Sequence, residues 1–319
     1  MSDAHIVPAD AAGIARAAEL LVEGRLVAVP TETVYGLAAR ADSEAAVAAI
    51  YRAKGRPDFN PLIVHVADLA MAERLAVIDE RARSLAAHLW PGPLTLVLPL
   101  REAAPIAPAV CAGLSTLAVR MPAHSAMQAL LRETGLPLAA PSANRSGAVS
   151  PTEAAHVTSS LGDRVDLVLD AGPCERGLES TIVALRERGH WQLLRPGPIT
   201  REQLSAILGK PHDAAPGTIE APGQLASHYS PGKPVRLDAS EAAADEFLIG
   251  FGKVAGDCTL SASGDLAEAA ARLYVCLHLA AAAPQSRIAV APVAGEGIGA
   301  AIRDRLKRAA APTAARPAR

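Results

Sequence analysis

The sequence predicts an α/β protein with two domains: a larger N-terminal domain with a mixed sheet flanked by helices, and a small C-terminal α/β domain after a long linker. Three observations predict it. The chain has 319 residues, half of them apolar, which suits two domains of roughly 150 residues each. Helical patterns alternate with short β-rich runs as far as residue 208. A stretch rich in Pro and Gly then interrupts the pattern, which resumes near residue 245.

The elements of the larger domain follow from hydrophobic periodicity. Helical spacing of apolar residues predicts helices at 10–24, 42–54, 124–135, 151–162 and 199–209. Short apolar and β-branched runs predict strands at 25–30, 60–66, 94–100, 115–121, 136–140, 165–170, 180–185 and 190–196. Several of these strands follow one another without an intervening helix, so the sheet is expected to be mixed rather than wholly parallel.

The stretch at 210–234 has no apolar periodicity and is longer than most loops within a domain, so we interpret it as a linker. Beyond it, strands are expected at 245–252 and 287–293 and helices at 265–283 and 298–310. The predicted boundaries are residues 1–210 for the first domain, 211–235 for the linker, 236–310 for the second domain and 311–319 for a disordered tail.

Composition excludes several classes of protein. The formal net charge is −2 and is nearly balanced in both halves, which argues against a broad nucleic-acid-binding surface but leaves room for a local basic cavity. No apolar run approaches the roughly 20 residues that span a bilayer. The first thirteen residues lack the basic and apolar regions of a secretory signal, so a cytoplasmic location is expected.

The four cysteines are far apart and form no CxxC pair. They therefore indicate neither a zinc site nor a disulfide framework, and we expect small buried residues. Phosphate-binding and hydrolase signatures of the types GxxxxGK[ST], GxSxG and HExxH do not occur. The run GEGIGAA at 295–301 lacks the spacing of GxGxxG and is interpreted as a turn between a strand and a helix.

Polar clusters accompany five of the predicted strands. They are PTET at 30–33, KGRPDFNP at 54–61, STLAVR at 115–120, PSANRSG at 141–147 and LESTIV at 178–183. Because ligands of α/β sheets bind in loops beyond strand ends, the clusters are expected to converge on one cavity.

The residue types in these clusters suit a polyanion such as a nucleoside triphosphate, because Arg grips phosphate bidentately and Lys acts as a point charge. The cations are Lys54, Arg56, Arg120, Arg145 and Arg195. Neutral hydrogen-bonding groups come from Thr31, Thr33, Thr116, Ser142, Asn144, Ser146, Ser150, Ser180 and Thr181.

Each cluster taken singly also fits a capped turn, a cationic helix end or a loop that bonds to itself. His65 fits a buried core residue as well as a ligand. His228 and Tyr229 lie in the linker, where there is no core to fill, and are expected to anchor the linker onto a neighbouring surface.

These segments resemble a known family. VAVPTETVYGLAARA, KGRPDFNPLIVHV, LWPGPLTLVLP, STLAVRMPAH, LPLAAPSANRSGAVSPT, GLESTIV and LLRPGPIT, in this order, are similar to the YrdC-like domain of threonylcarbamoyl-AMP synthases. The linker with HYSPGKP and the C-terminal unit resemble the two-domain form, in which the small domain is Rossmann-like. The likeness runs from about residue 6 to 310.

The resemblance implies an enzyme that joins L-threonine, bicarbonate and ATP into threonylcarbamoyl-AMP and pyrophosphate. It implies that Mg²⁺ accompanies the ATP phosphates, that no protein residue is a metal ligand, and that the product passes to a tRNA threonylcarbamoyl transferase complex for t6A modification. Direct tRNA binding is left open.

The resemblance also implies roles for individual residues. Lys54 and Arg56 would be catalytic. L-Threonine would be bound by Thr33, His65, Arg120, Ala140 through its backbone, and Ser180. ATP would be bound by Arg56, Asn60, Thr116, Ser142, Asn144, Ser150, Arg195 and Tyr229. Glu32 is expected to hold the loop or a positive neighbour rather than substrate.

The chain departs from the family pattern in one linker segment and at one residue near the C-terminus. The linker reads PGQLASHYSP instead of PGMKYxHYAP, so only the HY-x-P part carries over, and Asp304 stands where Asn is expected. The alternative is an RNA-binding module of the same fold without synthase activity. A carbamoyltransferase of hydrogenase maturation would be expected to carry an acylphosphatase-like segment and zinc-finger cysteines, which the chain lacks.

Overall fold

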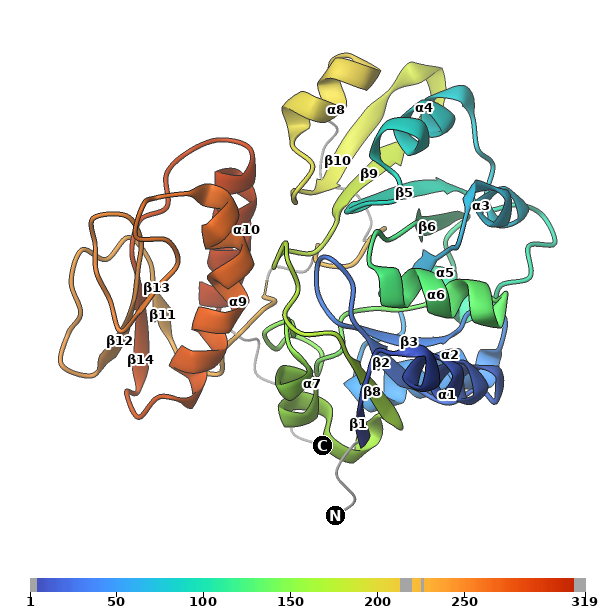
Figure 1. The fold of residues 1–319 in the computed structure, drawn as a ribbon. Helices are drawn as coiled ribbons and strands as arrows, with labels where there is room; N and C mark the ends of the chain where they lie inside the picture. The colour runs from blue at the N-terminus through green and yellow to red at the C-terminus, as the bar shows by residue number, and fades with distance from the viewer. Residues whose placement is uncertain (1–4, 213–219, 225–226, 313–319) are drawn as a thin grey trace.

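The larger part of the chain is built on one mixed sheet. The computed structural model describes residues 5–212, 220–224 and 227–312 (Figure 1). Ten strands form the sheet in the spatial order β1 (His5–Pro8), β8 (Leu167–Asp170), β2 (Val27–Val29), β3 (Gly36–Arg40), β7 (Leu138–Ala139), β4 (Ile63–His65), β6 (Thr116–Arg120), β5 (Leu94–Pro99), β9 (Thr181–Leu185) and β10 (Trp191–Arg195). In the described chain four neighbouring pairs are parallel and five are antiparallel, so the predicted mixed sheet is confirmed.

Helices cover this sheet. They are α1 (Ala11–Val22), α2 (Glu44–Lys54), α3 (Leu69–Leu75), α4 (Glu80–Leu89), α5 (Pro108–Cys111), α6 (Ser125–Thr134), α7 (Ala154–Leu161) and α8 (Arg201–Leu208), with 3₁₀ turns η1 (Gly162–Arg164) and η2 (Glu187–Gly189). Side chains cap four of the five predicted helices, as when Ser43 accepts a hydrogen bond from the Ala46 amide at the start of α2, whereas α7 has no side-chain cap. Strands β1 and β3 and helices α3 to α5 were not predicted.

The C-terminal part has its own sheet. Its wholly parallel strands lie in the order β11 (Val235–Arg236), β14 (Arg287–Val290), β12 (Glu246–Gly250) and β13 (Cys258–Thr259). Helices α9 (Leu266–Ala282) and α10 (Ile298–Ala310) lie between this sheet and the larger domain (Figure 1). The Gly-rich run at 295–301 follows β14 and leads into α10, as predicted, and its residues 298–301 already belong to the helix.

The expectation that the cysteines are unpaired was wrong for two of them. Cys258 on β13 and Cys276 on α9 form a disulfide, with their Cα atoms 5.9 Å apart. The pairing depends on the packing of α9 beside β13, which sequence spacing does not reveal. Cys111 and Cys174 are unpaired and buried, as predicted.

The two parts share an apolar interface. Val34, Val149 and Leu178 from the larger domain pack in the same cluster as the buried faces of α9 and α10. His156 on α7 stacks on His278 of α9, with ring centroids 3.8 Å apart. The linker segment 213–219, residues 225–226 and the tail from 313 onward lie outside the described residues. None of the described helices is long and apolar enough to cross a bilayer.

Replacing Gly177 with Ala should loosen the contact between the two domains. Gly177 has φ 64°, and a Cβ there would lie 2.4 Å from the Ala270 carbonyl oxygen of α9. Gly172 is the matched control, since it has φ 78° and no atom near its virtual Cβ. Urea unfolding should show that Gly177→Ala is about 1 to 3 kcal/mol less stable than Gly172→Ala. Equal stability of the two variants would mean that the interface accommodates the added methyl group without losing stability.

Candidate functional site

A cavity of about 530 Å³ lies against the central strands of the large sheet. It is lined by Thr31, Thr33, Val34, Gly36, Arg56, Ile63, His65, Arg120, Ala140, Pro141, Ser142, Glu179, Ser180, Arg195, Pro222, Gly223, His228 and Tyr229. All five predicted polar clusters contribute to this lining. Nine residues predicted to bind substrate line it: Thr33, Arg56, His65, Arg120, Ala140, Ser142, Ser180, Arg195 and Tyr229.

The PTET segment forms a tight polar turn after β2. The hydroxyl of Thr31 accepts hydrogen bonds from the amides of Thr33 and Val34 at 3.1 and 3.2 Å and donates to the Val34 carbonyl at 2.7 Å. The Thr33 hydroxyl lies 2.8 Å from that of Thr31. The turn is therefore held by its own side chains, and the second hydroxyl is presented to the cavity.

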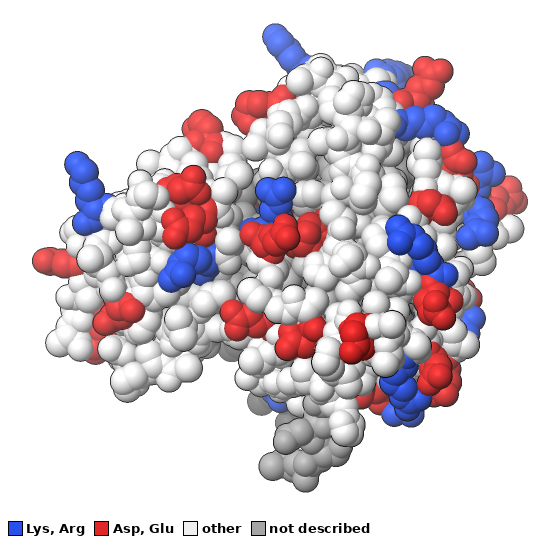
Figure 2. Space-filling view, in the orientation of Figure 1, with Lys and Arg blue, Asp and Glu red and all other residues white. Residues whose placement is uncertain are grey.

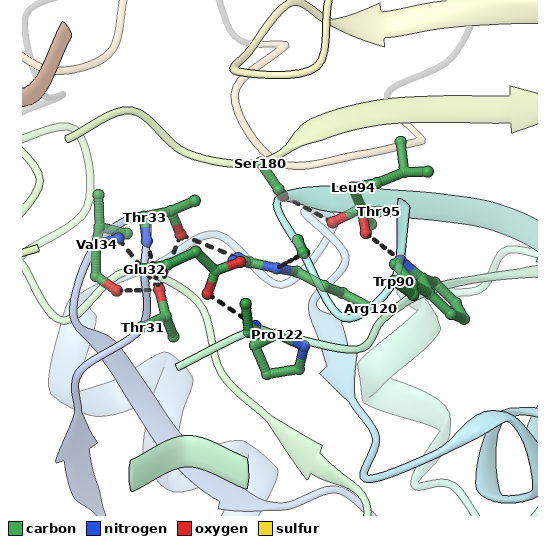
Figure 3. A network of polar contacts seen from close by, with 12 residues as sticks. Thr31, Glu32, Thr33, Val34, Trp90, Leu94, Thr95, Arg120, Pro122 and Ser180 are labelled. Carbon is green, nitrogen blue, oxygen red and sulfur yellow. Dashed lines mark hydrogen bonds and ion pairs between the residues drawn. The ribbon is translucent and has the colours of Figure 1, made fainter. Parts of the chain in front are cut away.

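Arg120, the last residue of β6, is fixed beside this turn (Figure 3). Its guanidinium donates to the Glu32 carboxylate at 2.6 Å and to the Thr33 hydroxyl at 3.0 Å. Burial would raise the pKa of the Glu32 carboxyl, but the charge and hydrogen bond of Arg120 lower it below its ordinary value. Glu32 thus holds a positive neighbour, which is one of the two functions expected for it.

Ser180 and Arg195 form another part of the cavity wall. The Ser180 hydroxyl lies 2.7 Å from that of Thr95 on β5 (Figure 3). Arg195, at the end of β10, donates to the Ser180 carbonyl at 3.0 Å and to its hydroxyl at 3.1 Å. Burial lowers the pKa of Arg195, although Tyr229 and Glu179 act against this.

The KGRP segment places two cations differently. Helix α2 ends at Lys54, and Gly55 turns the backbone in the left-handed conformation. Arg56 then reaches the cavity and donates to the carbonyls of Asn60 and Pro61 at 3.1 and 2.8 Å. Burial lowers its pKa to about 10, and the charge of Arg195 also lowers it.

Lys54 does not line the cavity. Its ammonium donates to the carbonyl oxygens of Ser142 and Asn144 and so holds the PSAN loop from behind. Burial lowers its pKa well below the ordinary value, and Arg56 adds to this effect. The structure therefore places Lys54 where it shapes the loop that carries Ser142.

Four further residues predicted to bind ATP lie outside the lining. Asn60 and Asn144 are buried, and the side-chain carbonyl oxygen of each has no hydrogen-bond partner. The Ser150 hydroxyl donates to Glu179 at 2.5 Å. Thr116 begins β6, so it shares a sheet face with Arg120 four residues later but lies toward the far end of the strand.

His65 and Ala140 border the cavity at the strands β4 and β7. His65 is buried, and its Nδ1 has no hydrogen-bond partner. Burial and the nearby charge of Arg120 lower its pKa to about 3, so the ring is neutral at physiological pH. Gly36 approaches this wall closely, because a Cβ there would lie 3.2 Å from that of Ala140.

The linker closes one side of the cavity. Tyr229 is buried with φ 63°, its ring centroid lies 4.1 Å from that of His228, and its hydroxyl has no partner. The Ser230 amide donates to the Gly147 carbonyl at 2.8 Å. Both aromatic residues are buried between the cavity and the helices α9 and α10 of the small domain, so they anchor the linker onto neighbouring surfaces, as expected.

Glu179 is the functional residue that sequence reasoning missed. It lines the cavity and forms an ion pair with Arg305 of α10, 126 residues away. Burial would raise its pKa, but Arg305 and Arg195 lower it to about 2. Its carboxyl group in the LESTIV cluster was the only available signal.

The arrangement provides buried positive charge and short hydroxyls around one space. In the described chain, neither Arg56 nor Arg195 forms an ion pair, whereas Arg120 and Glu179 do. Uncompensated guanidinium groups in a partly dry site favour an anionic ligand. Among the described residues, no group of three His, Cys, Asp or Glu side chains could hold a metal ion.

Two family models match the chain. Residues 19–197 match the Sua5/YciO/YrdC model, whose description reads "Telomere recombination". Residues 199–311 match the model described as "Threonylcarbamoyl-AMP synthase, C-terminal domain".

Individual relatives agree with these models. The chain is 48% identical over 231 residues to the threonylcarbamoyl-AMP synthase of Bacillus subtilis and 46% identical over 224 residues to that of Pyrococcus abyssi. These alignments cover 70% and 67% of this chain but only 66% and 64% of the relatives, so the chain spans about two thirds of their length. The structure of Pyrococcus abyssi Sua5 complexed with L-threonine is 36% identical, with a TM-score of 0.86 over 97% of both chains.

Replacing His65 with Gln should weaken the dependence of stability on pH. The pKa of His65 is about 3 when folded and 6.5 ordinarily, so below pH 6.5 the unfolded state binds a proton that the folded state does not. Stability should therefore fall by about 1.4 kcal/mol per pH unit from this residue as the pH decreases below 6.5. Urea titrations at several pH values should show that the free energy of unfolding changes less steeply with pH in the variant. An unchanged slope would mean that folded His65 is already protonated.

Proposed function

The chain belongs to the Sua5/YciO/YrdC family, and from this we propose that it is an L-threonylcarbamoyladenylate synthase. It would convert L-threonine, bicarbonate and ATP into threonylcarbamoyl-AMP, pyrophosphate and water. The observation that carries the proposal is the single cavity in which Arg56, Arg120 and Arg195 meet small hydroxyl groups. The names of the relatives and the L-threonine complex of a similar chain support it.

We assign the L-threonine subsite to the side of Arg120. Its guanidinium would pair with the substrate carboxylate, and the hydroxyls of Thr33 and Ser180 would bond the polar groups of the amino acid. The neutral His65 ring and the Ala140 backbone would complete this subsite. Because Glu32 already neutralises part of the charge of Arg120, the subsite suits a zwitterion rather than a polyanion.

We assign the ATP subsite to the side of Arg56 and Arg195, the two cavity cations without a carboxylate partner. Ser142 and Tyr229 line the same region. Asn60 and Asn144 are buried outside the lining, with their side-chain oxygens unpaired, and would shape the ATP subsite from behind. Ser150 and Thr116 would act from the border of the subsite. Mg²⁺ would arrive as part of the MgATP substrate, bound to its phosphates.

The chemistry needs two bond-forming steps. The deprotonated threonine amine attacks the bicarbonate carbon, so that a C–N bond forms and water leaves. A carbamate oxygen then attacks the α-phosphorus, and the bond to pyrophosphate breaks. Both steps bring anions together, and Arg56 and Arg195 would stabilise the developing charge, with Lys54 holding the loop of Ser142 in place.

The linker and the second domain would protect the reaction. Carbamates and mixed anhydrides react readily with water, and a segment that places His228 and Tyr229 over the cavity would exclude it. We therefore propose that 211–235 acts as a lid between domains 1–210 and 236–310. We further propose a cytoplasmic location and transfer of the product to a tRNA threonylcarbamoyl transferase complex.

The alternative, an RNA-binding module, has less support. Figure 2 shows acidic and basic side chains interspersed over one face of the molecule, without a continuous basic area. A binding surface for nucleic acid is expected to concentrate positive charge. RNA binding without threonine-dependent chemistry would nevertheless favour that alternative.

Pyrophosphate release should depend on L-threonine. With ATP, Mg²⁺ and bicarbonate present, adding L-threonine should start release, which a coupled phosphate assay detects. L-Serine should give about 10- to 200-fold lower kcat/KM, because it lacks the methyl group that would pack on Val34 and Ile63 of the lining. Release that is independent of the amino acid would contradict the proposed function.

Alanine at Lys54 or Arg56 should abolish turnover in a folded protein. The loss of either cation should reduce kcat/KM at least about 100-fold. Arg56→Ala removes charge stabilisation, and Lys54→Ala removes the support of the loop that carries Ser142. Arg52→Ala is the matched control, since Arg52 is an exposed cation on α2, the helix that ends at Lys54. Circular dichroism would verify the fold. Near-normal activity of folded Arg56→Ala would refute its role.

A further inference from the structure

One guanidinium of the small domain reaches the wall of the cavity in the large one. Arg305 on α10 has 0% of its surface exposed. It donates to Glu179 at 2.9 Å, to the carbonyl of Pro196 at 3.0 Å and to its neighbour Asp304 at 2.7 Å. Two of these acceptors belong to the large domain, so α10 is attached directly to the segment that follows Arg195.

Three hydrogen-bond donors hold the Glu179 carboxylate. One oxygen accepts from the Ser150 hydroxyl at 2.5 Å, and the other accepts from Arg305 and from the Tyr274 hydroxyl of α9 at 2.8 Å. Donors from three separate segments therefore hold it, and it is neither a free base nor a free ligand. Two of these three donors, Tyr274 and Arg305, belong to the second domain.

The position of Glu179 matters because of its neighbours. Ser180 follows it in the chain and receives both hydrogen bonds of Arg195 described above. Glu179 also attracts Arg195, one of the two cavity cations without an ion pair. A carboxylate at this point without its guanidinium would repel the phosphates of ATP and draw Arg195 away from them.

The linker rests on the same guanidinium. The guanidinium carbon (Cζ) of Arg305 lies 5.3 Å from the centroid of the Tyr229 ring, within the range of a cation–π contact. The amide of His228 donates to the carbonyl of Arg308, one turn further along α10. Domain, linker and cavity wall thus meet at Arg305.

We propose that Arg305 is a positioning residue for the nucleotide subsite: it neutralises and fixes Glu179, so that the cavity keeps the surplus positive charge that a nucleoside triphosphate needs. The proposal rests on the proposed function for the identity of the ligand. The second domain would then be a structural component of the ATP subsite as well as a cover. The Thr31 turn and Arg120 of the threonine subsite have no contact with α10 among the bonds described, and this subsite shares only Ser180 with the segment next to Glu179. It should therefore be affected less than the ATP subsite.

The test measures ATP affinity by calorimetry on the full chain, so that it does not depend on catalysis. Arg305→Gln should weaken ATP binding at least about tenfold, because it leaves a buried carboxylate unpaired beside the phosphates. L-Threonine affinity should change by a smaller factor than ATP affinity, because Ser180 is the residue that the threonine subsite shares with the segment that Arg305 holds. Arg303→Gln is the matched control: Arg303 is on the same helix but donates to the carbonyls of Val293 and Gly295 within the small domain.

A double variant separates positioning from general damage. Adding Glu179→Gln to Arg305→Gln removes the unpaired charge and should restore ATP affinity to within about threefold of Glu179→Gln alone. This comparison does not require Arg305→Gln itself to fold. If Arg305 had a merely structural role, the double variant would bind ATP as weakly as Arg305→Gln, or more weakly.

The outcomes also distinguish this proposal from the proposed function. Loss of ATP affinity in Arg305→Gln with rescue by Glu179→Gln supports the positioning role. Unchanged ATP affinity in folded Arg305→Gln, or no rescue in the double variant, overturns it. Failure of the proposed function would instead appear in the wild-type protein, as ATP binding without threonine-dependent release of pyrophosphate.

Discussion

Uncompensated positive charge in a buried cavity is the constraint on which this site depends. Arg56 and Arg195 are buried, and their guanidinium groups donate to carbonyl and hydroxyl oxygens rather than to carboxylates. Such an arrangement is unfavourable for the empty protein, since carbonyl dipoles replace only part of the lost hydration. It becomes favourable when an anion enters, so the stability of this region and the affinity for the ligand act against each other.

The carboxylates near the cavity are arranged so that they do not remove this surplus. Glu32 is bound to Arg120 and to the Ala123 amide, while Glu179 is bound to Arg305. Each acid is thus neutralised by one specific partner, and two cations remain for the ligand. This explains how a cavity with strong local charge occurs in a chain whose formal net charge is only −2.

The short hydroxyls serve a related purpose. Thr31 stabilises the turn through the backbone of Thr33 and Val34, and Thr95 supports Ser180 from the neighbouring strand. Because the supporting hydroxyls are themselves buried and bonded, the hydroxyls of Thr33 and Ser180 are held in place before a ligand binds. Preorganised polar groups of this kind favour selective recognition, since an analogue that cannot bond them leaves them unsatisfied.

The sequence by itself determined most of the regular elements. Helices such as α1, α2 and α9 have long apolar periods and N-terminal capping residues, and these are local properties of the chain. It also indicated the polar clusters, because hydroxyls and arginines recur beside strands. Strand β3 (Gly36–Arg40) escaped prediction because it has no alternation: it is a short run of small, mostly buried residues that becomes a strand through pairing with β2 and β7.

Only the tertiary structure decided which residues of the polar clusters face the cavity and which support it from behind. Lys54 and Arg56 are two residues apart, yet one faces a loop and the other the cavity, because Gly55 reverses the backbone between them. The pairing of Glu179 with Arg305 and the disulfide between Cys258 and Cys276 join distant parts of the chain. Local pattern carries no information about such contacts, since they depend on how the two sheets and their helices pack.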